Sequence, residues 1–109
     1  VELLSDIRDK KQEYFVCLTL DGANRLIAKR VVTIGTLTAS LVHPREVFAD
    51  AIADRAASII VAHNHPSGSL EASQADKEVT NRLRQVGELL GISLVDHIII
   101  TKDHFQSII

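Results

Sequence analysis

The sequence contains a single cysteine and no apolar stretch long enough to span a membrane. Because Cys17 has no second cysteine to pair with inside the chain, nothing indicates an oxidising compartment. No signal-peptide pattern opens the chain either, so we expect a cytoplasmic protein that does not contact membranes. Cys17 lies within the apolar run of residues 15–20, which favours a small buried side chain over a reactive thiol.

A basic stripe is also absent from the sequence. The chain has 12 Lys and Arg residues against 14 Asp and Glu residues, the formal net charge is −2, and the basic side chains are scattered. Domains that bind nucleic acid usually carry a stripe or patch of positive charge. We therefore expect no strong nucleic-acid binding by this domain alone.

Linkers, internal repeats and low-complexity segments are missing as well. A chain of 109 residues is long enough for one domain and too short for two, and its hydrophobic content of 46% can support a core without disulfides. The chain begins without Met, inside a predicted helix at residues 1–11. We therefore expect residues 1–109 to be a single domain that is a fragment of a longer protein.

The order of elements predicts an α/β fold in which a mixed sheet packs against helices. Two strands joined by a turn rich in Asp, Gly and Asn form a hairpin. A helix beginning at Pro44 follows, then a continuous apolar strand of the kind that is buried on both faces. The next helix begins after an N-cap at Ser73 and ends before Gly91, a residue type common after helix C-termini. The predicted strands are 13–20, 25–34, 58–62, 92–101 and 105–109, and the predicted helices after the first are 44–57 and 74–90.

Three residues form a candidate metal site where the apolar strand ends. His63 and His65 are two positions apart, which places both imidazoles on one face of the sheet. Asp76 follows in the first turn of the next helix, so a strand end, a tight loop and a helix start can bring three donors to one point. Three protein ligands and one water are typical of catalytic zinc. We predict one zinc ion here, with iron and manganese left open.

Each part of this pattern has a simpler interpretation when it is taken alone. Two histidines at a strand end could form a polar rim, and Ser73 with Asp76 could be a variant of the helix capping box. The combined pattern favours a metal site. A zinc nucleobase deaminase is excluded, because its signature needs a Pro-Cys-x-x-Cys segment and this chain has one cysteine.

Several segments together resemble the JAMM motif of the JAB/MPN metalloprotease family, in the version found in its RadC branch. The segments are His-Asn-His-Pro-Ser-Gly at 63–68, Ser-Gln-Ala-Asp at 73–76, Gly-Thr at 35–36, His-Pro-Arg-Glu at 43–46 and Asp-His-Ile-Ile-Ile at 96–100. The resemblance covers nearly the whole chain. It implies a curved mixed sheet flanked by helices, similar in outline to the cytidine deaminase fold, and zinc held by His63, His65 and Asp76.

The resemblance also assigns roles to two further residues. Glu13 matches the position of the family's catalytic glutamate, which implies a general base, and Ser73 matches the serine that polarises the substrate carbonyl. A charged residue at a strand start is the simpler interpretation of Glu13. Its rival as base is Glu46, which we instead expect to oppose a helix dipole. RadC chains commonly have Pro before the motif serine, where Ala72 stands here, so a backbone restraint is lost but no chemical group.

The expected function is zinc-dependent hydrolysis of peptide or isopeptide bonds, with a peptide or protein as substrate. The alternative is a non-catalytic metal-binding or adaptor domain of a protein associated with DNA repair. A metal-dependent amidase rate that disappears in Glu13→Gln while zinc stays bound would separate the two. The RadC name is tied to DNA repair, but nothing in this sequence indicates repair chemistry. RadC proteins usually carry a helical segment upstream, so the chain resembles their C-terminal domain.

Overall fold

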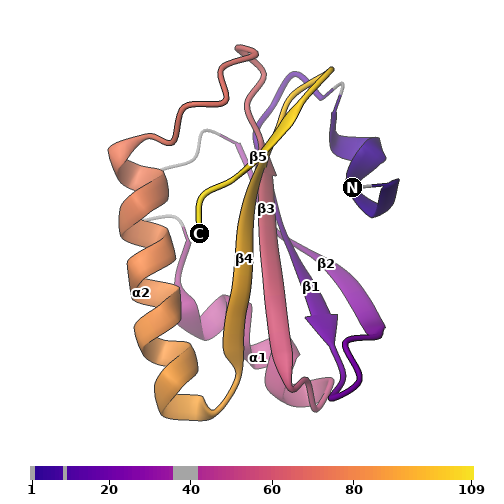
Figure 1. The fold of residues 1–109 in the computed structure, drawn as a ribbon, viewed down its shortest axis with the longest axis vertical. Coiled ribbons are helices and arrows are strands. Elements are labelled where there is room, and N and C mark those ends of the chain that lie inside the picture. Colours follow the sequence, from indigo (N-terminus) through magenta and orange to yellow (C-terminus); the bar gives the residue numbers. More distant parts are fainter. Residues whose placement is uncertain (1, 9, 36–41) are drawn as a thin grey trace.

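The computed structural model describes residues 2–8, 10–35 and 42–109. These residues form a five-stranded mixed sheet with strand order β2-β1-β3-β4-β5 and two α-helices packed on it, so the predicted α/β fold is confirmed (Figure 1). The elements in chain order are η1 (Glu2–Ile7), β1 (Tyr14–Leu20), β2 (Leu26–Ile34), α1 (Pro44–Ala53), β3 (Ser58–Asn64), α2 (Gln74–Leu90), β4 (Ser93–Ile100) and β5 (Phe105–Ser107).

The sheet topology brings three strand ends together. β1 pairs antiparallel with both β2 and β3, whereas β3 and β4 run parallel and are connected through α2. Phe15 of β1 lies opposite His63 of β3, and His63 lies opposite Ile99 of β4. The beginning of β1 therefore meets the ends of β3 and β4 at one edge of the molecule.

Two apolar cores lie on opposite faces of this sheet, and Figure 1 shows α2 and η1 on its two sides. Successive residues of β1 alternate between the two cores, as a pleated strand requires. The core between sheet and α-helices includes Phe15, Cys17, Ile59, Val61, Val47, Phe48, Ala51, Val79 and Leu83. The core under η1 includes Leu4, Ile7, Val16, Leu18, Ala62 and Ile100.

Cys17 is 1% exposed within the first core, and burial raises its thiol pKa to about 12. The prediction of a buried small side chain at this position is therefore confirmed, and a thiolate nucleophile there is strongly disfavoured.

Several predicted boundaries shift. The expected helix at 1–11 is a short 3-10 helix, η1, while Val1 and Asp9 lie outside the described residues, as does Thr36 of the 35–36 segment. The helix expected to reach Ala57 ends at Ala53, because Arg55 has a φ of 55°, a left-handed conformation that an α-helix does not continue. The predicted strand at 58–62 extends to Asn64, which places His63 inside the sheet.

The predicted limits of α2 are confirmed. Ser73 is its N-cap, and Gly91 follows its end with a φ of 73°. The helix has 17 residues and is therefore about 25 Å long, so its two ends lie in different environments. Its first turn meets the strand ends described above.

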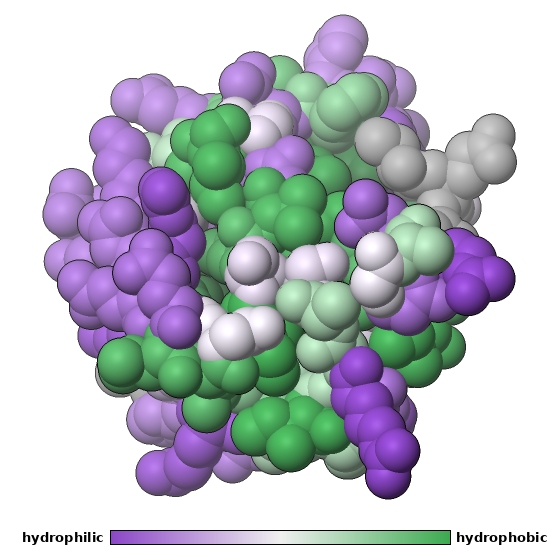
Figure 2. All heavy atoms as spheres, turned by 60° about the horizontal axis from the view of Figure 1, so that its bottom comes forward, coloured by the Kyte–Doolittle hydropathy of each residue, from purple (hydrophilic) through white to green (hydrophobic). Residues whose placement is uncertain are grey.

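The C-terminal end of α2 carries exposed apolar side chains. Leu89 is 87% exposed and Leu90 is 45% exposed, and Ile52 of α1 is 55% exposed. Figure 2, which turns the bottom of Figure 1 toward the viewer, shows hydrophobic residues across the middle of a face surrounded by hydrophilic ones. Among the described residues, no helix combines the length and the apolar character needed to cross a membrane.

Candidate metal centre

His63, His65 and Asp76 converge at the edge where β3 ends and α2 begins. The Nε2 atoms of the two histidines are 2.8 Å apart, His63 Nε2 lies 3.0 Å from Asp76 Oδ1, and His65 Nε2 lies 3.3 Å from Asp76 Oδ2. The side chains of His63 and Asp76 are 0% and 1% exposed, and that of His65 is 12% exposed. The three donors could hold a metal ion, as the spacing in the sequence predicts.

The end of β3, the loop after it and the start of α2 bring the three side chains together. β3 carries the first histidine in the sheet, and Pro66 then prevents the strand from continuing. Gly68 adopts a φ of 85°, which turns the chain back toward α2. At the helix start, the Ser73 backbone N–H donates to Asp76 Oδ2 at 2.7 Å, and Ser73 Oγ accepts from the Asp76 N–H at 3.1 Å. This capping box fixes the aspartate side chain toward the histidines.

The donor set fits zinc. A tetrahedral zinc ion with bonds of about 2.0–2.1 Å holds its nitrogen ligands about 3.3 Å apart. The Nε2 atoms of His63 and His65, at 2.8 Å, need to separate by only about 0.5 Å to reach that spacing. The far nitrogen of His65 supports this geometry, because its Nδ1 lies 2.8 Å from the Ser69 carbonyl oxygen. That oxygen only accepts, so the proton of the neutral ring is assigned to Nδ1 and the lone pair to Nε2.

The electrostatics of the cluster favour an ionised aspartate. Burial works to raise the pKa of Asp76, but the adjacent His63 and His65 imidazoles and the Ser73 backbone N–H outweigh it and hold the pKa well below its usual value. When His65 is protonated, its Nε2 can donate to Asp76, and this raises the pKa of His65 above its ordinary value. A carboxylate that stays ionised beside two imidazoles is the charge arrangement that a divalent cation requires.

Glu13 lies immediately before β1, at the edge of this cluster. If the register Phe15 to His63 is continued by two places, it puts Glu13 opposite His65 on the same face of the sheet. Glu13 lines a groove with Gly35, Pro66 and Ser67, and its charge contributes to the raised pKa of His65. Because β1 and β3 are antiparallel, the start of β1 lies beside the end of β3, as a catalytic role for Glu13 requires.

Glu46 and Ser73 have structural surroundings that the sequence analysis anticipated. Glu46 lies in the first turn of α1, where its side chain is 61% exposed and pairs with Arg45 at 3.8 Å. Ser73 is the helix cap, and its hydroxyl oxygen accepts the Asp76 N–H, which leaves the hydroxyl proton available to another group.

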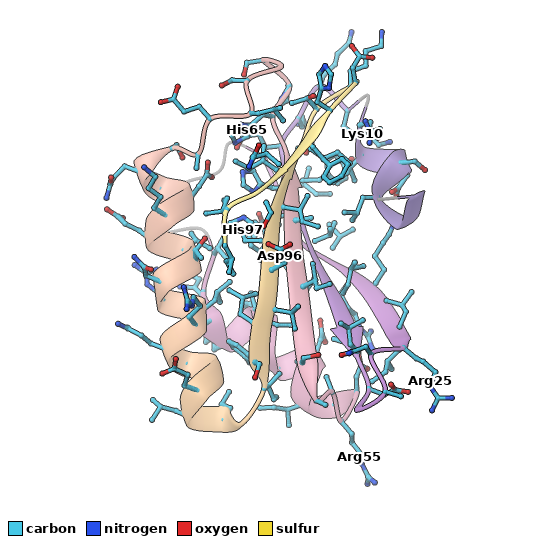
Figure 3. All side chains as sticks on the ribbon, viewed as in Figure 1. Lys10, Arg25, Arg55, His65, Asp96 and His97 are labelled. Carbon is cyan, nitrogen blue, oxygen red and sulfur yellow. The ribbon has the colours of Figure 1, made fainter. Side chains whose placement is uncertain are left out.

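Residues that the sequence analysis did not assign also shape the site. His97 of β4 is 0% exposed, its Nε2 lies 2.9 Å from His63 Nδ1, and burial lowers its pKa to about 3. Thr80 of α2 lies 2.6 Å from the other nitrogen of His97. Figure 3 shows His65 and His97 on the α2 side of the sheet. His97 belongs to the 96–100 segment of the family resemblance, which was the available signal.

Asn64, between the two histidines, faces the opposite side of the sheet and holds the segment before β1. Its Oδ1 accepts from the Tyr14 N–H at 2.6 Å, and its Nδ2 donates to the carbonyl oxygens of Lys10 and Gln12 at 3.3 and 2.9 Å. The side chain is 1% exposed, so these bonds are shielded from water. Asn64 therefore links the position of the Glu13 backbone to that of β3.

A second groove lies beside His65 and carries several positive charges. It is lined by His65, Pro66 and Gly68 together with the basic side chains Arg8, Lys10, Lys11 and Lys102. The basic residues that are scattered in the sequence are thus partly gathered in space. Pro66 and Lys11 also line the groove that contains Glu13, so the two grooves adjoin.

Comparison with known proteins gives one consistent family. The model of the RadC-like JAB domain matches residues 1–109. A UPF0758 protein of Methanospirillum hungatei is 54% identical over 105 residues, which are 96% of this chain and 47% of that protein. UPF0758 proteins of Bacillus licheniformis and Syntrophotalea carbinolica are 53% and 47% identical over 106 and 102 residues, covering 97% and 94% of this chain and 47% and 45% of those proteins. The chain spans less than half the length of these relatives.

Proposed function

The chain belongs to the family of RadC-like JAB domains, and from this premise and the geometry of its His-His-Asp cluster we propose a zinc-dependent hydrolase of peptide or isopeptide bonds. The observation that carries the proposal is the convergence of His63, His65 and Asp76, whose donor atoms all lie within 4.8 Å of one another. Its neutral nitrogen and ionised oxygen donors are the set that zinc prefers.

The proposed chemistry needs a group that moves a proton. A zinc ion, when bound, would supply a Lewis acid that polarises a carbonyl and lowers the pKa of water to about 7. Glu13 is the proposed general base, because continuing the register of β1 and β3 places it opposite His65, and it lines the adjoining groove. It would take a proton from the attacking water and later deliver that proton to the leaving amine.

Ser73 is the proposed donor to the substrate carbonyl oxygen. Its lone pair already accepts the Asp76 N–H, so the remaining hydroxyl proton is the one that it can offer. A peptide lying along the two adjoining grooves, which share Lys11 and Pro66, would pass both Glu13 and His65. This placement supports a chain-like substrate over a small molecule in a closed cavity.

Glu13→Gln tests the assignment of the base. The amide keeps the size of the side chain but removes its basicity, so hydrolysis of fluorogenic peptide and isopeptide substrates by the zinc-loaded protein should fall by at least ~100-fold. Zinc content and thermal stability should remain those of the wild type. Glu46→Gln is the matched control, since that carboxylate is exposed at the start of α1 and should be dispensable. Undiminished hydrolysis in Glu13→Gln, or loss in Glu46→Gln alone, would contradict the assignment.

Metal-free wild-type protein and zinc-loaded protein should also differ in rate. If no peptide or isopeptide is hydrolysed in either form while zinc binds stoichiometrically, the domain is a metal-binding adaptor and not a hydrolase. If zinc does not bind, the site assignment itself is wrong.

A further inference from the structure

A network of buried hydrogen bonds connects two of the three proposed metal ligands, His63 and Asp76, through two residues that are not proposed ligands. His63 Nδ1 lies 2.9 Å from His97 Nε2, His97 Nδ1 lies 2.6 Å from Thr80 Oγ1, and Thr80 Oγ1 lies 2.8 Å from the Asp76 carbonyl oxygen. All four residues are at most 4% exposed. We propose that His97 and Thr80 are positioning residues, which fix His63 in the tautomer that turns the Nε2 lone pair toward the metal.

The backbone carbonyl of Asp76 decides which group donates in each of these hydrogen bonds. The backbone carbonyl oxygen of Asp76 can only accept a hydrogen bond. It lies 2.8 Å from Thr80 Oγ1, so the Thr80 hydroxyl proton points at it. Because Thr80 donates its one hydroxyl proton to this carbonyl, its oxygen must accept a hydrogen bond from His97 Nδ1. The remaining nitrogen of the neutral His97 ring carries a lone pair and accepts from the Nδ1 proton of His63.

The consequence lies at the other nitrogen of His63. With the proton of the neutral ring held on Nδ1, the Nε2 atom presents a lone pair to His65 Nε2 and to Asp76 Oδ1, at 2.8 and 3.0 Å. While both rings are neutral, two nitrogen lone pairs and a carboxylate in such proximity repel one another, and either a metal ion or a proton on His65 relieves that repulsion. The hydrogen bonds therefore orient the cluster for binding a cation. This inference rests on the zinc site of the proposed function.

The hydrogen-bond network also ties β4 to the two elements that carry His63 and Asp76. His63 belongs to β3, His97 to β4, and Thr80 with Asp76 to the first two turns of α2. The Phe15 ring of β1 stacks on His63 at 6.1 Å between centroids and meets His97 edge-on at 5.7 Å. The Phe15 ring thus limits the tilt of both imidazoles, while the hydrogen bonds at their nitrogens limit their rotation.

Zinc affinity measures this role without any need for a substrate. In competition with a chromogenic chelator, His97→Leu should weaken zinc binding by roughly 10–100-fold, the usual effect of removing an outer partner of a metal-bound histidine. Thr80→Val removes the hydroxyl at almost unchanged shape and should weaken binding by about tenfold. Thr80→Ser keeps the hydroxyl and should restore wild-type affinity. His104→Ala is the control, because that histidine is exposed in the turn between β4 and β5.

Ring-nitrogen NMR gives a second readout that a purely structural role would not change. In zinc-loaded wild-type protein, His63 should show a protonated Nδ1 and a metal-bound Nε2, and Thr80→Val should broaden or lose the Nδ1 proton signal. If wild-type protein binds zinc and Thr80→Val and His97→Leu bind it equally tightly, the positioning role is wrong while the zinc site stands. If wild-type protein binds no zinc, the zinc site and this role are both wrong.

Discussion

At the scale of single residues, the two nitrogens of each ligand histidine have separate tasks. The Nε2 atoms of His63 and His65 face Asp76, while their Nδ1 atoms are bonded to His97 and to the Ser69 carbonyl. Spacing along the sequence predicted that His63, His65 and Asp76 form a metal site, and the structure brings these three side chains together. Spacing could not identify the outer partners, because their contact with the ligands depends on how α2 and β4 pack.

The raised pKa of His65 predicts opposite effects of pH on zinc binding and on metal-free stability. Zinc needs the neutral imidazole, so affinity should fall about tenfold per pH unit as the pH drops below the raised His65 pKa. In metal-free protein, the protonated ring donates to Asp76, and this stabilisation is complete below the unfolded value of 6.5. It is lost as the pH rises through the folded pKa.

Chelator competition and metal-free thermal melts over the range in which histidine titrates measure these two trends. Zinc affinity that does not change with pH would contradict the assignment of His65 as a ligand whose proton the metal displaces. Metal-free stability that rises through the same range would contradict the His65–Asp76 hydrogen bond as the cause of the raised pKa.

At the scale of elements, the sequence predicted which segments are helices and which are strands better than it predicted the residues at which they end. Alternation and apolar runs located the strands, and the cap residues Ser73 and Gly91 located α2 to the residue. The end of α1 was missed, since the left-handed Arg55 has no signal of the kind that glycine gives. The extension of β3 to Asn64 was missed because it depends on pairing with β1 and β4.

Gly87 in α2 gives a prediction about element packing. A Cβ added there would clash with the Ile92 carbonyl oxygen, which is backbone and cannot rotate away. Alanine would gain about 1 kcal/mol of helix propensity, but the clash should cost more, so Gly87→Ala should lower the free energy of unfolding by about 1–2 kcal/mol.

Urea denaturation of metal-free protein measures the effect of Gly87→Ala. Gly22→Ala is the control, because an added Cβ there meets nothing within 4 Å, and it should leave stability unchanged or slightly higher. Equal stability of the Gly87→Ala variant and the wild type would show that the turn from α2 into β4 adapts without cost.

At the scale of the whole molecule, charge is distributed unevenly, which the sequence alone did not reveal. The chain has a net charge of −2, yet four basic side chains line the groove beside His65. Arg8 is partly engaged, because its Nη1 donates to the carbonyl oxygens of Thr101 and Lys102, and Lys10 lies over the Tyr14 ring. With four basic side chains in this groove and a net charge of −2 on the chain, the surface offers limited positive charge to a polyanion.

We predict weak binding of duplex DNA by this domain. Four cations can displace at most four counterions, so the slope of log K against log salt should be no steeper than about −3.6, with an affinity near that of non-specific binding. Fluorescence anisotropy at several salt concentrations measures both. Nanomolar affinity with a steeper slope would contradict this view of the surface.

Metal analysis of the purified protein tests the central claim most directly. After supply of zinc and removal of the excess, the wild-type chain should hold one zinc ion, and His65→Ala should lose most of it while keeping its fold by circular dichroism. His65 is the appropriate ligand to remove because its side chain is 12% exposed, whereas that of His63 is 0% exposed. His104→Ala should retain full zinc content. Wild-type protein with clearly less than one zinc per chain, or a His65→Ala variant that binds as much as wild type, would contradict the metal centre.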